Sequence, residues 1–169
     1  WMRHKLHPES RERKILGRPH VYGSWTLDNQ HGKIYHAGHK GVMWAYDIKE
    51  ETWSPIEDFP GWGLSTGNAP LVYHPDIGCM LVMGRKGKVA AWDPEKNTVE
   101  ILPGSNPDQS GYHGHAVYNT VRREAMFWFG NTKHQVTLVG SDGKVVPKKK
   151  APDTVHSGEG SSSIFLTYD

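Results

Sequence analysis

The feature that most constrains the fold is an internal repeat with a period of 46 residues. Three apolar runs end in a glycine at this spacing, in the pairs Ala37-Gly38, Met83-Gly84 and Phe129-Gly130. The triplets Ala45-Tyr46-Asp47 and Ala91-Trp92-Asp93 share the period. A period in the forties that contains only short apolar runs is typical of β-propeller blades, each built from four antiparallel strands. The repeat therefore predicts an all-β propeller fold.

Turn residues divide each unit into four short strands. The first unit runs from about 21 to 56, and its first turn lies at 29–32. In the second unit we expect strands at about 69–74, 79–84, 88–92 and 98–102. In the third we expect them at about 115–119, 125–129, 135–139 and 144–147. The apolar run 125–129 lacks alternation, which indicates a strand buried on both faces.

The chain is interpreted as a single partial propeller with three full blades, at 18–60, 61–104 and 105–150. Residues 1–17 resemble the last two strands of an earlier blade, and 151–169 resemble the first strand of a later one. Such an arrangement leaves exposed sheet edges, which proteins avoid. Two interpretations follow: two copies close a ring as a homodimer, or the chain is a truncated part of a longer propeller without independent function.

The first unit resembles the kelch repeat in three segments. These are Gly32–Gly38, Ala45-Tyr46-Asp47 and Thr52–Ile56, in which Trp53 follows Asp47 by six residues. The second unit retains Trp92-Asp93 but has Val99 in place of the later tryptophan. The resemblance implies a kelch-like propeller that binds a glycan or protein ligand through its loop face.

Composition narrows the function classes. The net charge of +2, from 20 basic and 18 acidic residues, is too small to indicate a nucleic-acid partner. No apolar run is long enough to cross a bilayer, and no apolar segment of a signal peptide follows the opening residues. Cys79 is the only cysteine, so no intrachain disulfide forms. The compartment is not fixed by these features, and the expectation leans to an extracytoplasmic one.

Candidate ligand-binding residues lie in the loops that lead into the innermost strands, at 61–68, 104–114 and 156–161. Trp62 lies between two glycines, and Asn68 closes the first of these loops. Trp62 is interpreted either as a platform for a sugar ring or as a plug between blades.

Histidines suggest a metal or acid–base site in the third unit. His113 and His115 are two residues apart and face the same side of a strand. His134, near the third strand of that unit, completes a predicted set of ligands for a divalent ion such as zinc. His115 is also a candidate ligand-binding residue. The alternative is that two of the 11 histidines fall in phase by chance.

A second resemblance is to propeller-type polysaccharide lyases that act on uronic-acid polymers. It implies acid–base roles for Tyr112, His113 and His134, and a role for Arg122 in neutralising the substrate carboxylate. The alternative for Arg122 is a solvated position in a hairpin turn. Whether the chain is an enzyme therefore stays open, with a non-catalytic binding module as the first hypothesis and a lyase as the second.

Overall fold

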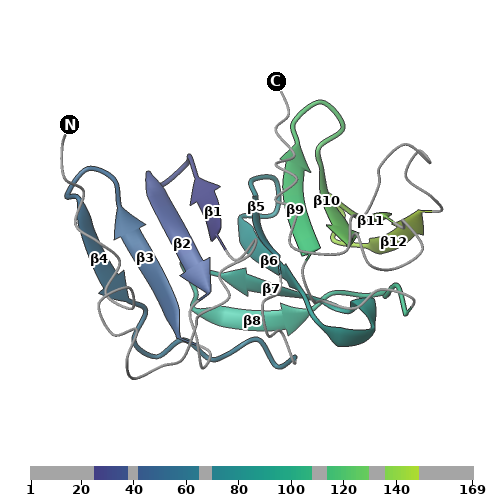
Figure 1. The fold of residues 1–169 in the computed structure, drawn as a ribbon, viewed down its shortest axis with the longest axis horizontal. Helices are drawn as coiled ribbons and strands as arrows, with labels where there is room; N and C mark the ends of the chain where they lie inside the picture. The colour runs from purple at the N-terminus through teal and green to yellow at the C-terminus, as the bar shows by residue number, and fades with distance from the viewer. Residues whose placement is uncertain (1–24, 38–41, 65–69, 108–113, 130–135, 149–169) are drawn as a thin grey trace, which may run out of the picture.

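The computed structural model describes residues 25–37, 42–64, 70–107, 114–129 and 136–148. This part of the chain is all-β, with three four-stranded antiparallel sheets that follow one another along the sequence (Figure 1). It contains no helix capable of spanning a bilayer.

Each sheet is formed by four strands that are consecutive in the sequence. Sheet A contains β1 (Trp25–Asp28), β2 (Lys33–Ala37), β3 (Met43–Asp47) and β4 (Thr52–Pro55). Sheet B contains β5 (Leu71–His74), β6 (Cys79–Met83), β7 (Val89–Asp93) and β8 (Thr98–Ile101). Sheet C contains β9 (Gly114–Asn119), β10 (Glu124–Phe129), β11 (Val136–Gly140) and β12 (Val145–Lys148).

The predicted division of each unit into four antiparallel strands is confirmed, and the strand limits predicted for units two and three agree within two residues. The spacing between corresponding strand ends varies by one residue around 46, as the predicted strand limits imply. The first hairpin of sheet B ends its first strand at His74, and that of sheet C at Asn119, which is 45 residues later. The third hairpins, between the third and fourth strands, begin after Asp93 and Gly140, which are 47 residues apart. The two shifts cancel and preserve an average spacing of 46.

Four of the hairpins begin with the same side-chain device. A carboxylate or amide oxygen at the end of the strand accepts the backbone N–H groups two and three residues later, at 3.0–3.1 Å. The residues with this role are Asp28, Asp47, Asp93 and Asn119. The fourth turn residue then adopts a left-handed conformation, with φ between +51° and +65° in five turns, at Gly32, Glu51, Gly78, Asn97 and Arg123.

Sheet B is buried on both faces because successive side chains of a strand point to opposite sides. Met80, Val82 and Trp92 pack with residues of sheet A. Leu81 and Met83 point the other way and pack with Phe127 of sheet C, among others. A strand such as β6 is therefore apolar without alternation, and four of its five residues are at most 1% exposed.

The first strands of the sheets lie together. β1 contacts β5, and β5 contacts β9 and β10. In Figure 1 these strands lie toward the middle of the molecule, and β4, β8 and β12 lie at its periphery. The antiparallel order brings the turns between first and second strands to the same end as those between third and fourth strands. We call this the turn end, and the opposite end, which carries the connections between sheets, the loop end.

Candidate functional site

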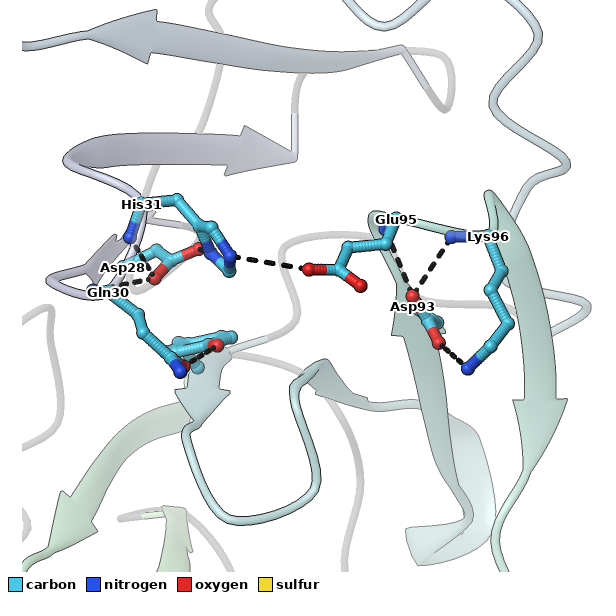
Figure 2. Close-up of polar contacts among 7 residues, drawn as sticks. Asp28, Gln30, His31, Asp93, Glu95 and Lys96 are labelled. Carbon is cyan, nitrogen blue, oxygen red and sulfur yellow. Dashed lines mark hydrogen bonds and ion pairs between the residues drawn. The ribbon is translucent and has the colours of Figure 1, made fainter.

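The turn end carries a histidine between two carboxylates from neighbouring sheets. Nδ1 of His31 lies 2.7 Å from Oδ2 of Asp28, and Nε2 lies 3.5 Å from Oε1 of Glu95 (Figure 2). The His31 side chain is 37% exposed and that of Glu95 is 77% exposed, whereas that of Asp28 is completely buried. The site is therefore open to solvent on the Glu95 side and fixed to the protein on the Asp28 side.

Two hairpin turns create this arrangement. Oδ1 of Asp28 accepts the backbone N–H groups of Gln30 and His31, which places the imidazole beside the second carboxylate oxygen. In the β7–β8 turn, Asp93 accepts the N–H groups of Glu95 and Lys96 in the same way. Because β1 and β7 belong to packed sheets, the two turns face each other across the boundary between sheets A and B (Figure 2).

Two tyrosines lie near the buried Asp28 carboxylate. The hydroxyl of Tyr73 donates a hydrogen bond of 2.7 Å to Oε1 of Gln30. Burial, followed by repulsion from Asp28, raises the pKa of Tyr73 and that of Tyr35 to about 12. Both phenols are therefore neutral near pH 7 and unsuited to act as general bases there.

A second polar cluster joins sheets B and C at the same end. Asp76, in the β5–β6 turn, accepts hydrogen bonds from the Tyr118 hydroxyl and from Arg123, whose Nε lies 2.9 Å from Oδ1. The hydrogen bonds from Arg123, and then from Tyr118, hold the pKa of Asp76 below its usual value. Each pair of adjacent sheets is thus linked by polar contacts between hairpin turns.

His74 lies directly beneath this second cluster. Its side chain is fully buried, its ring packs edge-on against Tyr118 at 4.9 Å, and Nε2 lies 3.2 Å from the carbonyl oxygen of Val139. Nδ1 has no hydrogen-bond partner among the described residues. Burial lowers the pKa of His74. The neutral imidazole is a part of the boundary between sheets B and C.

The loop end of sheet B carries a group of cations. Arg85, Lys86 and Lys88 are exposed and belong to the β6–β7 connection, which contains one 3-10 turn. None of them forms an ion pair with another residue in the described part of the chain. Within the described part of the chain, these three side chains thus form an exposed group of cations without acidic partners.

The backbone beneath these cations is held in place by the connection to sheet C. Gly87 is buried, its φ is +59°, and its carbonyl oxygen accepts the N–H of Asn106 at 3.0 Å. Asn106 is itself 2% exposed, and its Nδ2 donates to Oγ1 of Thr137 in sheet C at 2.9 Å. The cationic loop is consequently anchored to two sheets.

The predicted ligand-binding residue Trp62 lies in the core. Its side chain is 5% exposed and packs at 5.2 Å against Phe59, which in turn packs against Trp92. A tryptophan that stacks on a sugar ring must expose one face of its indole. The structure instead places Trp62 in the core between sheets A and B.

Of the other predicted site residues, the structure describes His115 and Arg122. His115 is partly buried on β9, its ring stacks on Trp128 at 6.2 Å, and burial lowers its pKa. Arg122 lies exposed in the β9–β10 turn and forms an ion pair of 2.8 Å with Glu124. The structure does not bring these two residues together.

The remaining predicted residues, Asn68, Tyr112, His113 and His134, lie outside the described residues, as do the predicted partial blades 1–17 and 151–169. The proposed zinc set of His113, His115 and His134 is thus untested. Among the described residues, no group of three or more His, Cys, Asp and Glu side chains is arranged to hold a metal ion.

Sequence reasoning missed both of the sites described above. The cationic loop had a visible signal, three basic residues within the four positions 85–88, but 85–87 was interpreted only as a turn and Lys88 as the start of a strand. The contact of His31 with Glu95 had none, because the residues are 64 positions apart and occupy different turns of their units.

Comparisons with known proteins identify no family for this chain. No protein-family model matches it, and neither does any curated protein. Among solved structures, an auxiliary nutrient binding protein from Bacteroides ovatus is similar over 73% of this chain, with 20% identity and a TM-score of 0.46. One from Bacteroides thetaiotaomicron is similar over 75%, with 13% identity and a TM-score of 0.39. The chain spans 35% and 41% of their lengths. At these TM-scores the similarity assigns no ligand to this chain.

Proposed function

We propose that the chain is a non-catalytic binding module that takes an acidic glycan at the loop end of sheet B. The observation that carries the proposal is the group of exposed cations, Arg85, Lys86 and Lys88, without acidic partners in the described part of the chain. Arginine binds carboxylates through two parallel hydrogen bonds, and lysine adds a compact charge. A uronic-acid polymer presents carboxylates at regular intervals and so matches several cations at once.

Preorganisation supports this use of the loop. The backbone N–H of Asn106 ties the loop to the next connection through the Gly87 carbonyl, and the Asn106 side chain ties that connection to Thr137, so that binding orders long side chains but not the backbone. Exposed ion pairs contribute about 0.2–1 kcal/mol each. Three of them give weak affinity per site, and multivalent contact with a polymer raises the overall affinity.

The proposed setting is a propeller, with sheets A, B and C as successive blades. Three features support it: the four-strand order of each sheet, the contacts among β1, β5 and β9, and the burial of sheet B on both faces. In such a ring the loop end of each blade contributes to one face. Closure of the ring by a second copy stays a prediction from the sequence.

The test is binding of polygalacturonate, with dextran as the neutral control, by isothermal titration calorimetry at low and moderate salt. We expect binding of polygalacturonate alone, and a marked loss of affinity as the salt is raised, since exposed charges are screened. The triple variant Arg85→Gln/Lys86→Gln/Lys88→Gln should bind about tenfold more weakly. The matched control is Lys49→Gln, which removes an exposed cation from the turn end.

Three outcomes would overturn the proposal. The triple variant retains full affinity, or dextran binds as well as polygalacturonate, or Lys49→Gln weakens binding as much as the triple variant. Polyglutamate serves as a further probe. If it binds more tightly than polygalacturonate at equal charge, the ligand is an acidic protein segment and the glycan assignment is wrong.

A further inference from the structure

The geometry at the turn end points to a second site, independent of the first: we propose that His31 and Glu95 bind a divalent transition-metal ion of the zinc type, with water completing the coordination. The site is formed by Nε2 of His31 and the Glu95 carboxylate, and Asp28 orients the imidazole from behind (Figure 2).

Hydrogen bonding at Nδ1 determines what Nε2 can do. The fully buried Asp28 carboxylate is an acceptor, so Nδ1 of His31 donates to it at 2.7 Å. In the neutral imidazole the lone pair is then on Nε2. It faces Oε1 of Glu95, which is also an acceptor, at 3.5 Å. Two acceptors that face each other at this distance repel, and a metal ion between them would bind both.

The distance suits a metal ion. Zinc binds histidine nitrogen at about 2.0–2.1 Å and carboxylate oxygen at about 2.0–2.2 Å in a tetrahedral arrangement, so adjacent ligand atoms lie about 3.3–3.5 Å apart. The separation of Nε2 from Oε1 is 3.5 Å. A direct hydrogen bond between them would be shorter, near 2.8 Å. The present spacing therefore accommodates an ion with little movement of either turn.

The outer contacts are those of a metal-binding histidine. Such histidines regularly donate their second ring N–H to a carboxylate, which fixes the tautomer and the ring orientation. Here Asp28 has that role, and its other oxygen is held by the N–H groups of Gln30 and His31. The nearby cation Lys96 is paired with Asp93 at 2.6 Å, which leaves the Glu95 carboxylate to His31.

The nitrogen ligand decides the class of ion. Imidazole favours zinc, copper and nickel, whereas magnesium and calcium prefer sites made of oxygen alone. Two protein ligands and a half-exposed histidine leave at least two positions for water or for a group from a bound molecule. The site is thus suited to a surface ion that bridges the protein and a second ligand.

The test is a Zn²⁺ titration of the full chain labelled with ¹⁵N, in which NMR follows the imidazole nitrogens and equilibrium dialysis gives affinity. We expect the Nε2 signal of His31 to shift on coordination and the Nδ1 signal to stay that of a donor. His31→Ala should lose one bound Zn²⁺. Glu95→Gln lies on an exposed turn, keeps the fold, and should weaken this site about tenfold or more.

Asp28→Asn tests whether Asp28 acts by orienting the His31 imidazole and fixing its tautomer. If its amide nitrogen faces His31, Nδ1 must become the acceptor and the proton moves to Nε2, which cannot then bind a metal. We expect a loss of about 10–100-fold in Zn²⁺ affinity, together with the changed tautomer in the NMR spectrum. Glu50→Gln, in the β3–β4 turn of the same end, is the matched control and should change nothing.

The proposal is overturned if the His31 nitrogens do not shift with Zn²⁺, or if His31→Ala binds as many ions as the parent chain. Binding that persists in all three variants would place the ion at other histidines. The same variants should bind polygalacturonate as the parent does, because the loop end lies at the opposite end of the strands. A failure at either end therefore leaves the other result interpretable.

Discussion

Replacing Gly87 by alanine is the sharpest test of how the cationic loop is held. Gly87 adopts φ of +59°, where a side chain is strained, and a Cβ built there would lie 1.9 Å from the carbonyl oxygen of Asn106. That oxygen belongs to a backbone segment tied to both Gly87 and Thr137 and cannot retreat alone. The substitution must therefore displace the loop, the connection after β8, or both.

The expected cost has two parts. A non-glycine residue in the left-handed region costs about 1–2 kcal/mol. Overpacking against a fixed backbone adds about 1–3 kcal/mol. We therefore expect Gly87→Ala to lower the free energy of unfolding by about 2–5 kcal/mol, a large share of the roughly 5–15 kcal/mol available to a protein of this kind. The melting temperature should fall by about 5–15 °C.

Gly78→Ala is the matched control. Gly78 has φ of +65° in the β5–β6 turn, but a Cβ there would meet nothing within 4 Å. It carries the conformational cost without the clash, so it should cost about 1–2 kcal/mol. Urea denaturation followed by tryptophan fluorescence measures both variants against the parent chain. Losses that agree within about 0.5 kcal/mol would refute the steric argument, as would full retention of polygalacturonate affinity by a destabilised Gly87→Ala.

Two further predictions concern the turn end. Glu51→Gly should stabilise the chain by about 1 kcal/mol in the same assay, because Glu51 is exposed and has a φ of +51°. The corresponding residues of two other turns are Gly32 and Gly78. An unchanged or lower stability would contradict this prediction. Stability should also fall as the pH drops below about 6.5, because burial lowers the pKa of His74 in the native state while the unfolded chain takes up a proton near the ordinary value of 6.5. The loss should not exceed about 1.4 kcal/mol per pH unit from this group. His74→Phe should reduce the change of the urea midpoint between pH 6.5 and pH 5. An unchanged pH dependence would exclude His74 as the cause.

The local parts of the fold were predictable because neighbouring residues determine them. Turn residues alone predicted the first turns of the three units at 29–32, 75–78 and 119–124, and in the structure these turns occupy 29–32, 75–78 and 120–123. Asp28 and Asn119 accept the N–H groups that begin two of these turns, which requires no long-range contact. The short apolar runs between the turns then became strands in the expected order.

Packing between sheets was harder to predict. A glycine-flanked tryptophan is equally compatible with a surface and with a core position, and only the approach of sheets A and B buries Trp62. Such features depend on which side chains of neighbouring sheets come to face each other, and a single sequence does not contain that information directly.

Packing between sheets also explains how the proposed site at the turn end forms. Four described hairpins begin with an oxygen that caps the turn, and at Asp47 and Asn119 this residue accepts only backbone N–H groups among the described residues. At Asp93 a lysine takes the second oxygen, and at Asp28 an imidazole takes it. The Asp28 carboxylate is buried away from solvent, so its oxygens must find hydrogen-bond donors within the protein. It therefore fixes the orientation of the His31 imidazole. The aspartate that caps a turn can thus also orient a histidine three residues later, and a carboxylate from the neighbouring sheet then completes the proposed site. A histidine without the acid tests the idea: Ile77→His would place a histidine at the corresponding turn position of sheet B, where position 74 is His rather than Asp, and should create no comparable Zn²⁺ site.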